Sequence, residues 1–379
     1  MQTSPQEAVA VAVAPSPRGR GTATGEAILL WTLSRAGLVI AAAVWIGVLA
    51  EDKTSSFLDR WSHWDAKHLV DIAKHGYDGV PGTPPDLGLP AFFPGMPLAL
   101  RLVHMIVSDW SLAGLLISFV AGTVAMIALA RLGELEGPPG TGPRAVLALL
   151  LCPTAVFLLA GYSEALFLAF AIPAWLAARR GNWIAAGLLA AGASCVRITG
   201  LFLALALIVE FVARRPPARR APWLLVPFVP LVAYSAYQYS RTGDWLAWQH
   251  AQEAGWGRSM TWPWDSFWTT WQMATNDGPF AWPFRMELAG AVLGVVALLW
   301  LLAVRRWSEF LYVGLQLGAL LLSSYYLSIP RSALLWWPIW ILIAQAGVRR
   351  RPILWGYALL AGPLMVLNTL TFLSGAWAG

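Results

Sequence analysis

The clearest indication of the fold is the stretch at residues 110–131, which reads WSLAGLLISFVAGTVAMIALA before it reaches Arg131. A helix needs about 20 consecutive, mostly apolar residues to cross the hydrocarbon core of a bilayer. This stretch has that length and carries no charge until its last residue. It therefore predicts a membrane-spanning helix with a basic residue at its cytoplasmic end.

The composition of the whole chain has the same character. Of its 379 residues, 58% are hydrophobic and 12% are charged, and the mean hydropathy is +0.60. Soluble domains carry about 25% charged residues, so these values exclude a disordered chain, a disulfide-stabilised scaffold and an ordinary cytosolic enzyme. Cys152 and Cys195 both lie in apolar stretches and say little about the redox environment. We expect an all-α polytopic membrane protein.

Eleven spans are predicted along the chain, and several are short for a full crossing. They cover residues 28–50, 110–131, 145–160, 164–178, 183–197, 200–213, 222–239, 288–304, 309–327, 332–348 and 353–375. Residues 1–25 are predicted to be a disordered cytoplasmic tail, and residues 26–379 a single transmembrane domain. Because residues 91–107 contain two prolines and Arg101, we expect a broken or re-entrant helix there. A true span at this point would invert every later segment.

Basic residues gather in five short segments, and these decide the orientation. The segments are residues 131–144, 179–180, 214–220, 305–306 and 349–351. The eleven-span arrangement places all five on the cytoplasmic side, as the positive-inside rule favours. The net charge of +6 therefore indicates contact with membrane lipids rather than with nucleic acid. It follows that the N-terminus is inside, that the C-terminus is outside, and that residues 51–109 and 240–287 form the large outer loops.

Three ionisable residues stand at the outer ends of predicted spans: Glu164, Arg197 and Arg331. An ionisable group at membrane depth is costly unless it is paired or faces a polar cavity. We expect these three side chains to converge on one site. The alternative is that the arginines extend to the lipid headgroups.

The first outer loop contains the densest group of reactive side chains, RWSHWDAKHLVDIAKHGY at residues 60–77. From Trp64 onward it predicts a short amphipathic helix, whose apolar face holds Ala66, Leu69, Val70 and Ala73, and whose other stripe holds Trp64, His68, Asp71 and His75. A helix on the membrane surface explains this pattern. The functional alternative is that Asp65, placed between aromatic residues and near His63, is a positioned base. The spacing of the histidines does not fit two ligands of one metal ion, so no metal site is predicted.

Two further segments supply aromatic and basic side chains. In AFFPGMP, residues 91–97, Phe92 and Phe93 either line a lipid or sugar site or belong to a kinked packing helix. Residues 240–287 hold eight of the 23 tryptophans, among them Trp256, which suit stacking on sugars or contact with isoprenoid chains. Arg241 and Arg258 in the same loop are suited to binding phosphate oxygens. Their spacing in the sequence does not decide which of the two would do so. The outer side of the protein is thus predicted to carry carboxylates, arginines and aromatic residues. This combination suits an enzyme that acts on a phosphate-bearing lipid and a sugar, and it would also suit a transporter.

The motifs in these segments resemble those of the PIG-V-type mannosyltransferases. The resemblance begins with Trp64-Asp65, Ile72-Ala73 and Gly76-Tyr77, and continues in Ala91-Phe92-Phe93-Pro94 with Pro97. The run from Tyr162 to Phe167, YSEALF, is similar to the second family motif. Arg197 with Gly200 and Pro330-Arg331 resemble two later, less specific elements. Ser332 stands where the family often has an aromatic residue, so the acceptor contacts are expected to differ. Residues 241–264 are similar to actinobacterial relatives.

The resemblance implies a GT-C-type glycosyltransferase fold and transfer of mannose from a polyprenyl-phosphate donor. The chemistry would take place on the outer face of the membrane, with inversion at the anomeric carbon. The composition, rich in Ala, Arg, Trp and Gly, favours the plasma membrane of a bacterium, and an internal membrane is the alternative. Asp65 would be the general base, Glu164 would orient the acceptor or assist, and Arg197 and Arg331 would stabilise the leaving phosphate. The pocket would include His63, Trp64, His68, Asp71, His75, Tyr77, Phe92, Phe93, Tyr162 and Trp256. No cofactor or metal is expected, since the lipid-linked sugar is the substrate.

Two other functions are compatible with the sequence. A transporter or flippase of polyprenyl-linked sugars would be expected to show inverted repeats with broken helices at matching positions, and none is evident. A non-catalytic membrane scaffold would tolerate changes at Asp65 and Glu164. The acceptor stays open among a glycolipid, a cell-wall glycan and a secreted protein.

Overall fold

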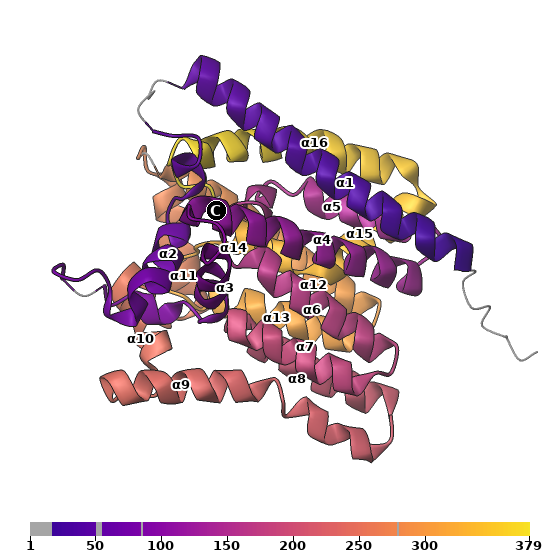
Figure 1. The fold of residues 1–379 in the computed structure, drawn as a ribbon. Helices are drawn as coiled ribbons and strands as arrows, with labels where there is room; N and C mark the ends of the chain where they lie inside the picture. The colour runs from indigo at the N-terminus through magenta and orange to yellow at the C-terminus, as the bar shows by residue number, and fades with distance from the viewer. Residues whose placement is uncertain (1–16, 51–54, 85, 279) are drawn as a thin grey trace, which may run out of the picture.

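The computed structural model describes residues 17–50, 55–84, 86–278 and 280–379. Within these residues the chain is helical, and its β structure is limited to one isolated bridge between Met260 and Ser323. The long helices lie side by side in a bundle (Figure 1). They are α1 (Pro17–Val44), α4 (Trp110–Glu136), α5 (Thr141–Leu150), α6 (Glu164–Arg179), α7 (Trp183–Val196), α8 (Thr199–Arg214), α9 (Phe228–Thr242), α12 (Ala281–Ala303), α13 (Trp307–Leu321), α15 (Trp337–Arg349) and α16 (Arg351–Leu373).

Several helices are long and apolar enough to cross a membrane. Four such segments are found in the described residues: Gly21–Val48, Trp110–Glu136, Ala281–Ala303 and Arg351–Leu373. Shorter apolar helices, Thr141–Leu150 and Trp183–Val196, lie beside them. The chain is therefore a multi-pass membrane protein, and the count of eleven crossings stays a prediction.

The structure differs from the predicted spans at several places. The span predicted as 222–239 is α9, which begins only at Phe228 after a 3₁₀ segment, and the span predicted from 288 is α12, which begins already at Ala281. The segment predicted as 145–160 is divided, because α5 ends at Leu150 and a separate 3₁₀ turn, Ala155–Leu158, follows Pro153. The span predicted to reach 327 ends with α13 at Leu321. The span predicted from 332 begins only with α15 at Trp337, after the short α14 (Ile329–Ser332) and a 3₁₀ turn. These interruptions leave irregular backbone at one end of the bundle, where the candidate site lies.

The N-terminal prediction is also modified. Residues 1–16 of the predicted tail lie outside the described residues, whereas α1 already begins at Pro17. Residues 17–25 are thus helical rather than disordered. The helix continues as a π-helical turn, Trp45–Leu49, close to the predicted end of the first span.

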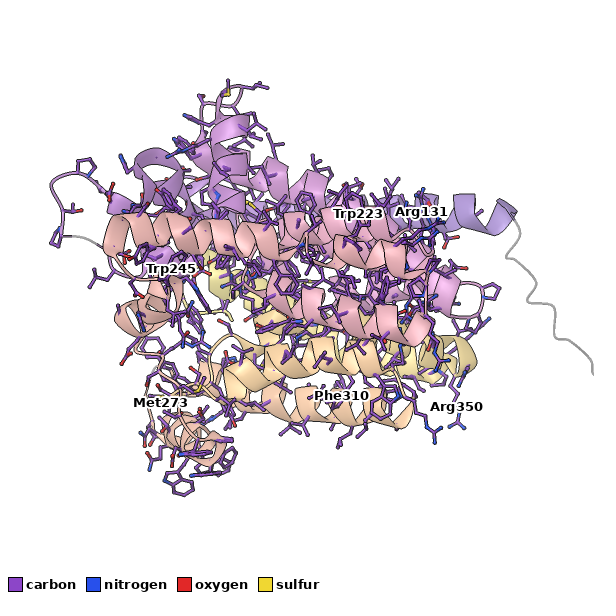
Figure 2. The ribbon with its side chains drawn as sticks, turned by 90° about the horizontal axis from the view of Figure 1, so that it is seen from below. Arg131, Trp223, Trp245, Met273, Phe310 and Arg350 are labelled. Atoms are coloured by element: carbon purple, nitrogen blue, oxygen red, sulfur yellow. The ribbon has the colours of Figure 1, made fainter. Side chains whose placement is uncertain are left out.

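All five basic segments lie at the same end of the bundle. Figure 2 shows Arg131 and Arg350 at this end and Trp245 and Met273 at the opposite one. This common location agrees with the sidedness used in the sequence analysis, since the five segments lie on one side and the two large loops on the other. Which end faces the cytoplasm stays a prediction.

Several arginines of the basic end are paired rather than free to meet lipid headgroups. Arg179 contacts three glutamates, with Nε 2.8 Å from Glu136 Oε1 and Nη1 2.7 Å from Glu210 Oε1, and it also pairs with Glu309. Arg306 pairs with Glu136 and Glu309. Glu210 and Glu309 are buried. This basic-end cluster joins the ends of α4, α6, α8 and α13, and hydropathy did not reveal it.

The first outer loop packs against the bundle. Its helix α2 (Asp65–His75) buries Ala66, Leu69, Ile72 and Ala73, and Leu69 and Ala73 pack with residues of α3 (Gly95–His104) and α4. The amphipathic face of α2 therefore meets protein, and a helix lying on the membrane surface is the wrong interpretation of it. Helix α3, with its 10 residues, is about 15 Å long, half of what a crossing of about 30 Å needs. A full span at 91–107 is thereby excluded.

Close contacts between small residues fix the loop that precedes α6. A Cβ atom on Gly114 of α4 would lie 2.9 Å from the Cα of Gly161, so only glycine fits there. Next to this contact, Ser118 donates a hydrogen bond from its hydroxyl to the carbonyl of Ala160 at 2.7 Å. Small residues allow such close approach of helices in membrane proteins. The contact holds residues 160–164 in place and thereby sets the position of Glu164.

Candidate active site

Four charged side chains meet at the end of the bundle opposite the basic-end cluster. Arg331 of α14 lies at the centre, with Nη1 2.7 Å from Asp65 Oδ2 and Nε 2.6 Å from Glu164 Oε1. Arg197, which follows α7, places its Nη1 2.8 Å from the same oxygen of Glu164. The structure thus brings together the three residues predicted to converge and joins Asp65 to them. We call Asp65, Glu164, Arg197 and Arg331 the ion cluster.

The ion cluster is deeply buried on one side and open on the other. Glu164 is fully buried and Arg331 is 6% exposed, while the side chains of Asp65 and Arg197 are 17% and 23% exposed. Burial alone would lower the pKa of Arg331, but the carboxylates of Asp65 and Glu164 outweigh it, and the net pKa lies above the ordinary value. Two negative and two positive charges balance, as buried charges require.

Aromatic rings support the central arginine. The guanidinium carbon of Arg331 lies 4.6 Å from the ring centroid of Tyr162 and 5.0 Å from that of Phe157. Tyr162 also donates a hydrogen bond from its hydroxyl to the carbonyl of His63 at 2.8 Å. Tyr162 and His63, which the sequence analysis placed in the pocket, therefore lie behind the ion cluster. Tyr162 contacts both Arg331 and the start of α2. Neither residue lines the two cavities described below.

The backbone just before Asp65 is strained. Trp64 has φ 50° and ψ −122°, in a region that bulky residues rarely adopt. Such strain persists only where the surroundings impose it, and it clusters at functional sites. Its consequence here is that Asp65 becomes the first residue of α2, where the helix dipole favours a negative charge.

A cavity of about 480 Å³ opens beside the ion cluster. Asp65, Arg197 and Arg331 line one part of it. The facing part comes from the second large loop, through helix α10 (Ala247–Trp256) and the residues after it, including Arg258. Phe92 and Phe93 line the cavity as well, as expected from the sequence. We call this space the large cavity.

Arg258 is the cation of the large cavity that has no carboxylate partner within the part of the chain that the structure describes. Its Nε donates to the hydroxyl of Ser323 at 3.0 Å, and burial lowers the pKa of its guanidinium. Hydrogen bonds on both sides fix the loop, from the Tyr325 hydroxyl to the Trp256 carbonyl at 2.6 Å and from the Ser259 amide to the Ser324 hydroxyl at 2.9 Å. The buried carboxylate of Glu287 acts on this guanidinium without forming an ion pair with it. A fixed guanidinium that makes no direct ion pair suits an anion.

Arg241 occupies a different place. It pairs with Asp78, donates to the side-chain oxygen of Gln238 at 3.0 Å and lies over the rings of Tyr77 and Tyr237. The large cavity is lined without it. The structure therefore distinguishes the two arginines, which the sequence could not: Arg258 lines the large cavity and Arg241 does not.

The tryptophans of residues 240–287 divide in the same way. Trp248 and Trp256 line the large cavity. The remaining six are exposed: Trp245, Trp262, Trp264, Trp268, Trp271 and Trp282. Exposed indoles at one end of a membrane protein are typical of an interfacial belt, and this interpretation suits the six exposed tryptophans. Contact of Trp248 and Trp256 with a sugar stays a prediction.

The remaining polar residues of α2 lie outside the lining of the large cavity. His68 stacks on Phe92 with ring centroids 5.5 Å apart, and its Nδ1 is 3.1 Å from Asp86 Oδ2. Asp71 is half-buried and His75 is exposed at the end of the helix. Among the described residues, no group of three or more His, Cys, Asp or Glu side chains is placed to hold a metal ion.

A second cavity of about 340 Å³ lies behind the first. The two share a thin wall, since Phe93 and Val196 line the large cavity while their neighbours Pro94 and Cys195 line the second. The hydroxyls of Tyr77 and Tyr234 donate to the carbonyl of Phe92. Arg101 also lines this cavity, and its Nε donates to the carbonyl of Ala73. Because these polar groups already have backbone partners, the lining of the second cavity is mainly apolar.

Sequence reasoning missed Gln316 and Trp377, which both line the large cavity. Gln316 on α13 is 2% exposed, and its Oε1 has no hydrogen-bond partner among the described residues. A lone glutamine inside the apolar stretch 309–327 was a usable signal, because polar groups in spans are rare and tend to be functional. Trp377 lines the cavity from beyond α16, and nothing in the local sequence indicates that the chain turns back there.

Residues 42–214 match the family model described as Mannosyltransferase (PIG-V). The chain is similar to GPI alpha-1,6-mannosyltransferase 2 of Cricetulus griseus, with 38% identity over 151 residues, which are 37% of this chain and 29% of the relative. It is 36% identical to the Mus musculus protein of the same name over 163 residues, 40% of this chain and 32% of the relative. The human protein is 39% identical over 151 residues, 37% of this chain and 29% of the relative.

These comparisons confirm the resemblance that the motifs carry. The match includes Asp65, Glu164 and Arg197 and ends before Arg258 and Arg331. The chain spans about a third of the length of the curated relatives it matches.

Proposed function

We propose, from the premise that residues 42–214 are of the PIG-V mannosyltransferase type, that this chain is a membrane mannosyltransferase using polyprenyl-phosphate-mannose. The acceptor is a hydroxyl of a glycolipid or glycan at the outer face of the plasma membrane, and the N-terminus is cytoplasmic. The observation that carries the proposal is the large cavity itself, whose lining holds both a carboxylate paired with an arginine and a second arginine, Arg258, that makes no ion pair with a carboxylate of the described residues.

Asp65 acts as the general base in this proposal. Its carboxylate accepts the proton of the acceptor hydroxyl, whose oxygen attacks the anomeric carbon of the mannosyl group. The bond between that carbon and the phosphate oxygen breaks, and its electron pair leaves with the polyprenyl phosphate. A single attack from the side opposite the leaving group inverts the anomeric centre. A base must lie within hydrogen-bond reach of the proton, and the partial exposure of Asp65 toward the cavity supports this role.

The arginines take different roles from those implied by the family resemblance alone. The charges of Arg197 and Arg331 are compensated by Asp65 and Glu164. Arg258 has no such partner within the described residues, so we assign to it the main contact with the donor phosphate, with the more exposed Arg197 beside it. Arg331 is then a positioning residue for Asp65, and Glu164 positions the two arginines. Charge fixed in place before the reaction stabilises a developing phosphate without reorganisation.

The second cavity supports a lipid-linked donor. Its lining is mainly apolar, and it lies directly behind the wall of the large cavity. Leu98 in its lining is 53% exposed, and Val229 and Val232 on the neighbouring face of α9 are each 62% exposed. Exposed apolar residues around the opening indicate contact with the bilayer interior, so a hydrocarbon chain attached to a phosphate would find both environments side by side.

The test is transfer from radiolabelled polyprenyl-phosphate-mannose by the purified full-length protein. We expect product with the wild type and a loss of roughly 10²- to 10⁴-fold with Asp65→Asn, as for removal of a general base. Asp71→Asn is the matched control, because it removes a carboxylate of the same helix that does not line the cavity. Normal turnover by a folded Asp65→Asn protein would overturn the base assignment. No transfer by folded wild type would overturn the donor assignment, and translocation of lipid-linked sugar would then be measured in vesicles.

A further inference from the structure

One wall of the large cavity is formed by the segment that follows α16. The helix ends at Leu373, and Gly375, with φ +80°, turns the chain back toward the ion cluster. The side-chain amide of Asn368 donates to the carbonyl of Ala378 at 2.6 Å and holds the returning segment against its own helix. As a result Trp377 lines the large cavity together with Asp65.

Trp377 also contacts the residue that precedes the proposed base. The ring centroids of Trp377 and Trp64 are 5.3 Å apart, with the planes at 86°. Trp64 is the strained residue with positive φ, and its side chain is 42% exposed. The two indoles therefore form a corner next to Asp65, and Trp377 is the member of the pair that faces the cavity.

The position of Asp65 decides which substrate lies in this corner. A base takes its proton from the acceptor hydroxyl, so the groups beside Asp65 border the acceptor, while Arg258 in the facing wall receives the phosphate of the donor. An indole presents a broad apolar face with a polar edge. A pyranose ring has the matching shape, with an apolar C–H face and hydroxyl groups around its rim. The side chain of a serine or threonine in a peptide offers no such face.

We propose that Trp377 is the platform on which the sugar ring of the acceptor stacks. This inference rests on the proposed function and assigns a specificity-determining role to a residue outside the matched segment 42–214. Ser332, the neighbour of Arg331 in the chain, also lines the large cavity.

The experiment uses Trp377→Ala and Trp377→Phe in the full chain, with Trp264→Ala as the matched control. Trp264 is 61% exposed and stacks on Trp262 away from the cavity. With methyl α-mannoside as acceptor, we expect Trp377→Ala to raise the acceptor KM about tenfold, which corresponds to about 1.4 kcal/mol. Trp377→Phe retains most of the affinity, and the donor KM stays unchanged. A serine-containing peptide is expected to accept no mannose.

Two outcomes would overturn the inference. One is a Trp377→Ala protein whose acceptor KM equals that of Trp264→Ala, or whose defect is explained by a lowered melting temperature. The other is transfer to the peptide but not to the mannoside. Binding of methyl α-mannoside is measured separately by saturation-transfer NMR without donor. If the mannoside binds in a manner that depends on Trp377 but the protein transfers no mannose, the proposed function is wrong and the acceptor subsite is still supported.

Discussion

The Nη1 atom of Arg331 lies 2.7 Å from Oδ2 of Asp65, so a residue near the C-terminal end of the chain fixes a carboxylate of the first outer loop. The same guanidinium binds Glu164, and its side chain is 7% exposed. Two of its nitrogens thus contact carboxylates of the protein, while the residue also lines the large cavity. This relationship separates two roles that arginines play at such sites, the holding of a base and the holding of a phosphate.

Arg331→Lys is expected to lower kcat at least tenfold, since a lysine ammonium cannot bridge two carboxylates as the guanidinium fork does. The donor KM is expected to change little, because Arg331 does not carry the phosphate. Steady-state kinetics with the donor varied measures both, and thermal unfolding shows whether the protein remains folded. If the donor KM rises while kcat is unchanged, Arg331 is a phosphate ligand and the positioning role is wrong.

Arg258→Gln is expected to do the opposite and raise the donor KM by roughly 10- to 100-fold, because a hydrogen bond to a charged group contributes about 1.5–3 kcal/mol. Its melting temperature should change little, since Arg258 is half-buried and makes no direct ion pair among the described residues. Arg241→Gln is the matched control, from the same loop but bound to Asp78. Equal donor KM values for the two variants would argue against a phosphate at Arg258.

The contrast between Arg258 and Arg241 shows which features of the site can be predicted from the sequence and which cannot. Charge and hydropathy predict most helices and which loops share a side, because both depend on local composition. Motif resemblance selects Asp65, Glu164, Arg197 and Arg331. The choice between two arginines of one loop depends on partners far away in the chain, Ser323 for one and Asp78 for the other.

The same limit applies to the divided spans and to the far walls of the cavity. Pro153 breaks the segment predicted as 145–160, yet proline also occurs inside α6 and α16 without ending them. Local sequence therefore does not decide which proline terminates a helix. Trp377 reaches the cavity through the turn at Gly375, and the hydrogen bond from Asn368 to the carbonyl of Ala378 holds the returning segment.

The reactivity of Cys195 can test whether a hydrocarbon chain occupies the second cavity. In a Cys152→Ser background it is the remaining cysteine of the chain, and it is half-buried in the cavity lining. We expect polyprenyl phosphate without a sugar to slow its labelling by a maleimide at least several-fold, because a hydrocarbon chain would cover the thiol. Inorganic phosphate is expected to give no protection. Labelling at the same rate with and without the lipid would show that the chain binds elsewhere.

The basic-end cluster is expected to stabilise the fold without taking part in the reaction. Arg179→Leu leaves three glutamates short of a partner, two of them nearly fully buried. Breaking a buried ion pair by removing one partner costs about 3–5 kcal/mol, so the melting temperature in detergent should fall by several degrees. Arg350→Leu is the control, because Arg350 is exposed at the same end of the bundle (Figure 2). Exposed substitutions usually change stability by less than about 0.5 kcal/mol.

Kinetics distinguishes this effect from one on the site. At a temperature where Arg179→Leu remains folded, its donor KM and kcat should equal those of Arg350→Leu, since the cluster and the large cavity lie at opposite ends of the bundle. A kcat defect in folded Arg179→Leu would mean that the two ends are coupled through α6, whose first residue is Glu164 and whose last is Arg179. In that case the glutamates of the basic end would have to be counted among the groups that set the geometry of the ion cluster.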